Sequence, residues 1–234
     1  MHFTFNGADS RNYGIYMRDP LPIFAAEEDT EYYDVPGREG SLTVKKGGHN
    51  DLETEMACYI KDIGDIGGAL AFIQGGGQLV QSVQPDRRLN VTFTGVPRAD
   101  RLVKGLDAWE MEVPVRIKPF RYFYPEAADI TIASSGTLIK NPGTYKSAPR
   151  IRIEGNGDIV LTVGMNTMAF TGIENGLIID SEEMNCYELD GVTRIYNDEQ
   201  IDIEEFPKIN PGTSFVTWTG SVSRIVITPR WRDR

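Results

Sequence analysis

The chain has 234 residues and a net charge of −10 at pH 7, with 40% hydrophobic and 25% charged residues. This length suits one large β domain or two ordinary ones, and no run of about 18 apolar residues could span a membrane. The acidic balance, without a cluster of basic and aromatic residues, argues against sequence-specific nucleic-acid recognition. The first residues lack the segments of a signal peptide, so we expect a chain made in the cytoplasm and not exported.

The N-terminal part begins with two short strands, expected in FTFNG (3–7) and in residues 13–17. The acidic run 27–31 is interpreted as a solvated loop that enters a strand, because no calcium-loop spacing surrounds it. Pro-Gly-Arg-Glu-Gly at 36–40 predicts a tight turn, and KKGGHN at 45–50 predicts a second turn.

Residues 52–60 alternate as a half-buried strand, with Cys58 on the apolar side as a small hydrophobic residue. Apolar residues at helical spacing predict a helix over 63–73, capped by Asp62 or Asp65 and ended by the glycines at 75–77. This triple glycine lacks the features of a phosphate-binding loop. Strands follow in QLVQSV and RLNVTFTGV.

Residues 108–118 form the longest alternating run, with Val113 and Val115 on the apolar side. Pro114, on the polar side, cannot donate a hydrogen bond, which predicts an edge or a bulge at that point. We expect this strand to end at Pro119 and a domain junction to follow near 120–130.

The second half has turn signals at intervals typical of a β-sandwich. They are Asn156-Gly157, Gly164-Met165-Asn166, Asn175-Gly176 and Asp190-Gly191. One core layer is expected from Ile151, Ile153, Ile159, Leu161 and Val163. At the end of the chain, residues 215–227 are predicted to form a closing β-hairpin that turns at Gly220.

No catalytic chemistry is indicated by the motifs. The two histidines, His2 and His49, lie near no nucleophile motif and no second metal ligand. The carboxylates between 180 and 205 could include a glycosidase pair, but they suit loops and solvated strand faces better. Trp218 and Trp231 could stack on sugars, although core and lid positions are the commoner reading. We therefore predict a protein that is not an enzyme and binds no metal or cofactor.

Several separated motifs resemble the distal tail proteins of long, non-contractile-tailed bacteriophages and related prophage tail components. They are Phe3-Thr-Phe5-Asn6-Gly7, Gly14-Ile15, Pro36-Gly37-Arg38-Glu39-Gly40, Gly143-Thr144, Ser147-Ala148-Pro149, Leu177 to Ser181, Pro211-Gly212 and Trp218-Thr219-Gly220. Single motifs are weak, but their order and spacing cover nearly the whole chain.

The resemblance implies a mainly β protein in two domains. The N-terminal domain, 1–124, would be a ring-forming sheet or barrel-like domain with one short helix. The C-terminal domain, 125–234, would be a galectin-like β-sandwich. The protein would form a ring, usually a hexamer, at the virion tail tip after assembly in the host cytoplasm. Its partners would be other copies, the tail tube protein, the tape-measure protein and the tail-tip fibre or lysin protein, around an axial channel for DNA.

Two sets of site residues follow from the patterns and the resemblance. The long strand and the turn at 36–40 are candidates for the contact between subunits, since ring subunits need exposed edges or flat faces. The candidates are Pro36, Gly37, Arg38, Gly40, Val113 and Val115. Scaffold positions are Gly143, Pro149, Asp180, Pro211, Gly212, Trp218 and Gly220.

Two other functional classes stay open. A carbohydrate-binding β-sandwich that contributes to host cell-wall adhesion is the main alternative, and a cell-wall hydrolase is the third. The sequence does not specify the number of subunits, the host, the receptor, or whether the gene belongs to a phage or a prophage.

Overall fold

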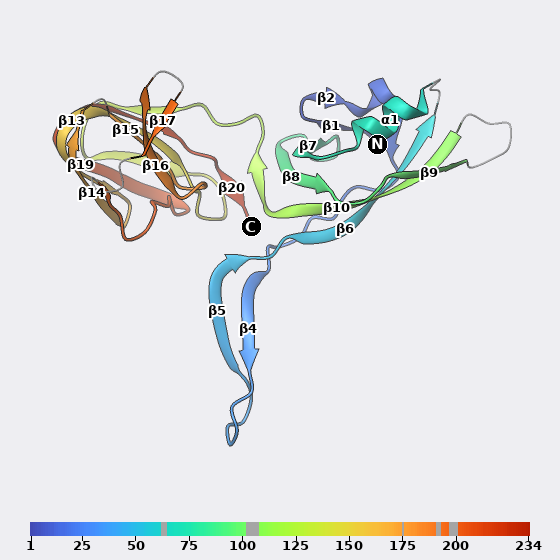
Figure 1. Cartoon of the computed structure of the whole chain (residues 1–234), viewed down its shortest axis with the longest axis horizontal. Coiled ribbons are helices and arrows are strands. Elements are labelled where there is room, and N and C mark those ends of the chain that lie inside the picture. Colours follow the sequence, from blue (N-terminus) through green and yellow to red (C-terminus); the bar gives the residue numbers. More distant parts are fainter. Residues whose placement is uncertain (62–64, 102–107, 175, 191–192, 197–200) are drawn as a thin grey trace. The chain divides into compact units, whose positions relative to one another are not determined.

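The computed structural model describes residues 1–61, 65–101, 108–174, 176–190, 193–196 and 201–234. These residues form two compact units, Met1–Tyr124 with Arg234, and Pro125–Asp233 (Figure 1). The described residues are mainly in β-strands, with one α-helix and one short 3-10 helix, which confirms the expected fold class. None of the described helices combines the length and the hydropathy needed to cross a membrane.

The main sheet of the first unit is antiparallel and follows the order β2-β1-β7-β8-β10-β6-β3, and β9 also pairs with β10. Its strands are β1 (Phe3–Phe5), β2 (Ala8–Asp9), β3 (Ile15–Met17), β6 (Leu52–Lys61), β7 (Gly76–Gln81), β8 (Arg87–Phe93), β9 (Arg98–Arg101) and β10 (Ala108–Phe123). The 3-10 helix η1 (Ser10–Tyr13) and the helix α1 (Ile66–Phe72) complete the unit.

The core of the first unit lies on one face of this sheet, under α1. Alternate residues of β6 and β10 enter it, as the sequence pattern predicts. They are Met56, Cys58 and Ile60 from β6, and Met111, Val113, Val115 and Ile117 from β10. Asp65 caps α1 by accepting a 3.0 Å hydrogen bond from the Gly68 N–H, and α1 buries Ala69 against the core. The helix ends at Phe72, before the expected glycine stop at 75–77, and Gly76 and Gly77 already belong to β7.

Strand β10 is longer than expected, since it runs past Pro119 to Phe123 with a register shift between Ile117 and Arg121. Pro114 is not at an edge, because β6 pairs with it on one side. On the other side, β9 ends its pairing at Glu112 and β8 begins at Val115. The Pro114 carbonyl accepts a 3.0 Å bond from Thr94 on that side. In an antiparallel pair, the N–H and the C=O of one residue point toward the same neighbouring strand. The N–H that Pro114 lacks would therefore point to the side where β9 has ended and β8 has not yet begun to pair.

Strands β4 (Glu28–Tyr33) and β5 (Leu42–His49) form a separate two-stranded sheet, called here the arm (Figure 1). The predicted turn at 45–50 is therefore wrong, because residues 45–49 belong to β5. The glycines there accommodate a bulge instead. The pairing jumps from Thr30↔Lys45 to Glu28↔His49, which leaves extra residues on β5, and Gly47 has φ +80°. The acidic run 27–31 is largely strand, not loop, and Glu28 pairs with Lys45 at 2.5 Å.

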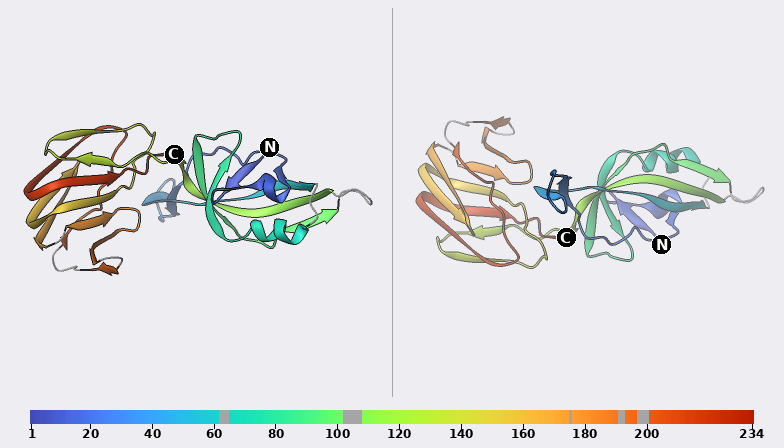
Figure 2. Two further views of the ribbon diagram at one scale, coloured as in Figure 1. Left: turned by 90° about the horizontal axis from the view of Figure 1, so that it is seen from above. Right: turned by 90° about the horizontal axis from the view of Figure 1, so that it is seen from below.

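The second unit has a sheet in the order β11-β19-β13-β15-β16-β17, to which β12 and β14 add through β19 and β13, and β18 through β14. The strands of this sheet are β11 (Ile130–Ile132), β12 (Thr137–Asn141), β13 (Arg150–Val163), β14 (Asn166–Ile173), β15 (Leu177–Asp180), β16 (Asn185–Asp190), β17 (Thr193–Ile195), β18 (Ile201–Asp202) and β19 (Gly212–Thr228). The unit also contains the short strand β20 (Arg232–Asp233), which is not part of this sheet. The five predicted core residues of β13 are at most 1% exposed. Figure 2 shows the strands of this unit side by side in a curled sheet.

Two predicted hairpins of the second unit are wrong, because each is a single long strand. β19 runs 17 residues through Gly220, and β13 runs 14 residues through Asn156-Gly157. The two strands pair with each other, and their register shifts between Asn156 and Val160. The glycines therefore support a matched bend of two neighbouring strands and not a chain reversal. The hairpin between β13 and β14 at Gly164-Met165 is confirmed. Asn175 and residues 191–192 of the remaining two turn signals lie outside the described residues.

Candidate interaction surfaces

The described residues contain no group of three or more histidine, cysteine or acidic side chains that could hold a metal ion. Both cysteines are buried free thiols, and burial raises the pKa of Cys58 to about 12. Cys58 is therefore protonated at neutral pH and is not a nucleophile. The His49 ring packs at 5.1 Å from the Phe120 ring.

In the arm, β5 is exposed along almost its whole length and β4 is exposed at its outer end. The outer half of the arm exposes apolar side chains, with Tyr32 at 69%, Tyr33 at 50%, Leu42 at 40% and Val44 at 39%. Tyr33 pairs with Leu42, and Val44 lies two residues further along the same face. A two-stranded ribbon is marginal in water by itself. The arm therefore carries an apolar face with no core of its own.

The turn at 36–40 lies at the tip of the arm, between β4 and β5. The Arg38 N–H donates a 3.1 Å bond to the Val35 carbonyl. Gly37 and Gly40 have φ values of +82° and +74°, which glycine adopts without strain. Added Cβ atoms at both glycines would meet nothing within 4 Å, so they are required by the backbone and not by packing. The whole turn, with Pro36, is exposed.

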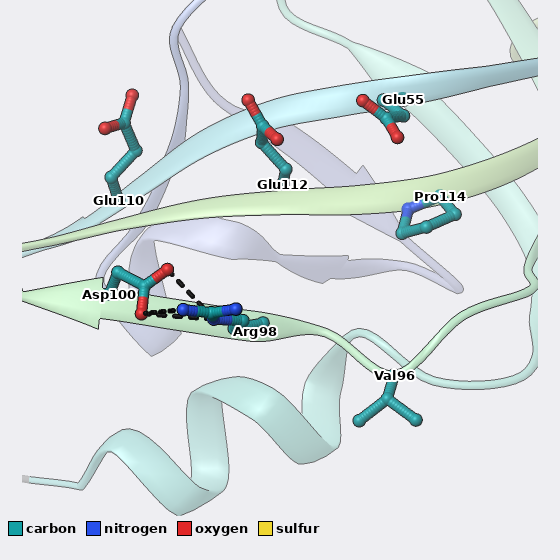
Figure 3. A pocket seen from close by; sticks show the side chains of 7 residues that line it. All are labelled: Glu55, Val96, Arg98, Asp100, Glu110, Glu112 and Pro114. Atoms are coloured by element: carbon teal, nitrogen blue, oxygen red, sulfur yellow. Dashed lines mark hydrogen bonds and ion pairs between the residues drawn. The ribbon is translucent and has the colours of Figure 1, made fainter.

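The outer face of the main sheet, opposite the core, holds a shallow groove of about 450 Å³ (Figure 3). Strands β6, β9 and β10 and the loop before β9 line it. The lining residues are Glu55, Val96, Arg98, Asp100, Glu110, Glu112 and Pro114.

The carboxylates of this groove differ in their partners. Asp100 is bound by Arg98 on the same strand, and Glu110 is 2.6 Å from the Arg18 guanidinium. Within the described part of the chain, the carboxylates of Glu55 and Glu112 have no hydrogen-bond or ion-pair partner. The groove therefore has uncompensated negative charge beside the apolar Val96, which is 89% exposed.

The structure places Val113 and Val115 in the core, at 0% and 1% exposure. Their side chains point away from the outer face, so another subunit cannot contact them on the folded chain. This corrects the choice of these two residues as interface candidates. The outward neighbours on β10 are Glu112, Pro114 and Arg116, which the same alternation had already placed on the polar side.

Three of the scaffold positions are held by specific contacts in the second unit. An added Cβ at Gly143 would lie 2.4 Å from the Arg232 carbonyl oxygen, so only glycine fits without a backbone shift. Pro149 is buried, and its carbonyl accepts a bond from the Ser181 N–H. Asp180, 2% exposed, accepts two bonds from Arg230, at 2.6 and 2.8 Å.

Burial alone would raise the pKa of Asp180. The hydrogen bonds from Arg230 and from the N–H groups of Glu183 and Glu182 outweigh this effect, so the pKa lies below its usual range. Asp180 is therefore a charged anchor for the end of the chain.

The other four scaffold positions lie on or before β19. Pro211 and Gly212 are exposed at the start of the strand, where Gly212 has φ +87°. Trp218 is half-buried, and its backbone N–H donates a 2.8 Å hydrogen bond to the Ser135 hydroxyl. Gly220 has φ +93°, and an added Cβ would lie 2.2 Å from the Asp158 carbonyl oxygen. At Gly220 both the backbone conformation and the close approach require glycine.

Comparison with known proteins gives a likeness in structure only. No family model and no curated protein matches the sequence. The chain is similar to the crystal structure of SPP1 Dit (gp 19.1), described as a paradigm of the hub adsorption apparatus in phages that infect Gram-positive bacteria. The TM-score is 0.70 at 12% identity, over 97% of this chain and 98% of that chain. A chain of the phage P2 baseplate in its activated conformation with Ca has a TM-score of 0.50 at 8% identity, over 97% and 92%. The fold is therefore that of phage hub proteins, as the sequence motifs predict.

Proposed function

We propose that this chain is a structural protein of a bacteriophage tail tip. One observation carries the proposal, which is the fold shared with SPP1 Dit over 97% of this chain and 98% of that one. The likeness extends through both compact units, so it is not the reuse of one common sandwich. The order of the motifs along the sequence supports the same assignment independently.

In this proposal the first unit, residues 1–124, assembles into a ring, which we expect to be a hexamer with an axial channel. The arm supports self-assembly because it exposes Tyr33, Leu42 and Val44 without a core to receive them. When a contact joins two different patches of identical subunits, the subunits form a closed ring if the rotation from one subunit to the next divides a full turn. The ring would connect the tail tube to the tip apparatus, with the tape-measure protein and a tip fibre or lysin protein as further partners. The second unit, a galectin-like sandwich, would decorate it.

The test is the mass and shape of the assembled protein. We expect light scattering at increasing concentration to show a multimer, and negative-stain images of the same samples to show closed rings. The double variant Tyr33→Ser/Leu42→Ser should shift the protein toward monomer without a change in its circular dichroism. Val83→Ser, at a side chain that is 53% exposed in a turn of the same unit, is the matched control and should assemble normally. A wild-type protein that stays monomeric at every concentration would contradict the proposal.

Carbohydrate binding by the second unit is a second candidate, favoured by one exposed apolar pair. Phe215 is 58% exposed and lies opposite Leu138, which is 55% exposed. An aromatic face at this exposure could stack on a sugar ring. A glycan screen in which Phe215→Ala abolishes binding would support this function, and a screen with no binding would remove it.

A further inference from the structure

We propose that the arm tip of one copy, residues 36–40, docks in the outer-face groove of a second copy, with Arg38 between Glu55 and Glu112. The inference rests on the proposed self-assembly and names the two surfaces that meet.

The arm tip carries one cation, Arg38, and one anion, Glu39, which are neighbours in the sequence and are both exposed. Arg38 is exposed, and within the described residues its guanidinium has no hydrogen-bond or ion-pair partner. The preceding Val35 is 42% exposed, and the exposed Pro36 follows it. The tip thus presents an unpaired guanidinium beside a small apolar surface on a narrow two-stranded projection.

The groove presents the complementary features on the first unit itself. Figure 3 shows Glu55, Glu110 and Glu112 projecting from the same side of β6 and β10. Glu110 is already bound by Arg18, so Glu55 and Glu112 are the carboxylates that remain to receive a cation. Pro114 and Val96 supply an apolar floor and edge. A guanidinium is the cation that best suits two nearby carboxylates, because its fork donates several hydrogen bonds at fixed angles.

The connectivity indicates that the groove receives the tip of another copy. β5 leads into β6 through residues 50 and 51, so the tip and the groove lie on opposite sides of this connection. The eight residues of β5 alone extend roughly 25 Å. Glu55 is near the start of β6, and Glu112 pairs further along it, opposite Ala57. Because both strands run on from the connection in extended conformation, the tip reaches away from the groove of its own chain.

A tip-in-groove contact joins two different patches of the same subunit. Each copy then offers one tip and one groove, and the contact repeats head to tail, which is the geometry that produces rings. The contact would place the unpaired Arg38 guanidinium against the acidic side of the next subunit.

A charge swap tests the contact. Arg38→Glu and Glu112→Arg, each alone, should weaken self-association on the order of 10- to 100-fold in sedimentation, because each places like charges together. The double variant Arg38→Glu/Glu112→Arg restores opposite charges and should regain most of the lost association. Lys140→Glu, at an exposed residue of the second unit, makes the same charge change as Arg38→Glu and should have no effect.

Cross-linking gives a second readout that leaves Arg38, Glu55 and Glu112 in place. A chain with Glu39→Cys in the tip and Val96→Cys at the groove, both at exposed positions, should give a ladder of covalent multimers when it is treated with a short bismaleimide. Glu39→Cys with Lys140→Cys should give none, and the buried native cysteines add little background. Rings that persist in Arg38→Glu, without the cross-linked ladder, would overturn this contact and leave the proposed function intact. A wild-type protein with neither rings nor cross-links would contradict both.

Discussion

Alanine replacements at Gly220 and Gly136 together separate two costs, the strain of a positive φ and the collision of an added Cβ. Gly220 combines φ +93° with a built Cβ only 2.2 Å from the Asp158 carbonyl oxygen and 3.2 Å from the Ile159 Cα. Gly136, in the same unit, has φ +89° but meets nothing within 4 Å. Gly136→Ala should therefore cost only the backbone strain, about 1–2 kcal/mol of unfolding free energy.

Gly220→Ala adds a collision with backbone atoms that cannot rotate away. Forcing extra volume into a packed position costs about 1–3 kcal/mol more, so the total should reach about 2–5 kcal/mol. Urea unfolding can be followed in a Trp109→Phe background, where the fluorescence comes from Trp218 and Trp231 of the second unit. Equal losses of unfolding free energy in the two variants would refute the assignment of a close approach at Gly220.

Three further predictions concern buried groups. Val113→Asp should prevent folding, because the side chain is 0% exposed and a buried unpaired charge is not tolerated; a folded monomer with normal circular dichroism would show that Val113 acts at an interface after all. Asp180 has a lowered pKa in the folded state, so it contributes stability above its unfolded pKa of about 3.9, which is lost as the pH falls through its folded pKa. In urea unfolding, Asp180→Asn should therefore have a lower free energy of unfolding than the wild type at pH 7, and the difference should become smaller toward pH 3. A difference that does not change with pH would contradict this. Cys58, with a pKa of about 12, should not react with a thiol reagent at pH 8 until urea is added, whereas fast reaction of the native protein would place it at a surface.

Alternation along the strands was the part of the fold that the sequence could predict. The inward set on β6 and β10 and the core residues of β13 follow directly from it, because a period of two assigns every residue to a face. Asp65 could be identified as the helix cap for a similarly local reason, since its carboxylate bonds an N–H only three residues away.

The glycine signals were harder to interpret, because the same residue supports a turn, a bulge or a close approach. Gly47 and Gly220 both have positive φ within a continuing strand. Whether the chain reverses there depends on which strand lies alongside, and that partner is distant in sequence. In the case of Gly220 the partner is β13, about 60 residues earlier.

The candidate site shows a related limit. The Pro-Gly-Arg-x-Gly motif was identified as an exposed turn, but its position at the end of a free-standing arm depends on the pairing of β4 with β5. Val113 and Val115 were chosen because their strand is long and apolar, but their side chains point into the core, whereas Glu112 points outward. In a half-buried strand the polar side faces outward, so the residues available to a partner are those that interrupt the apolar pattern.

The continuity of the arm with β6 has a mechanical consequence. A pull on the arm tip passes along β5 into β6, which pairs with β10 at ten consecutive positions. A tension directed along these antiparallel strands acts on all the hydrogen bonds of the ladder at once, instead of breaking them one after another from one end. The arm is therefore anchored against shear by the most extensive strand pairing of its unit.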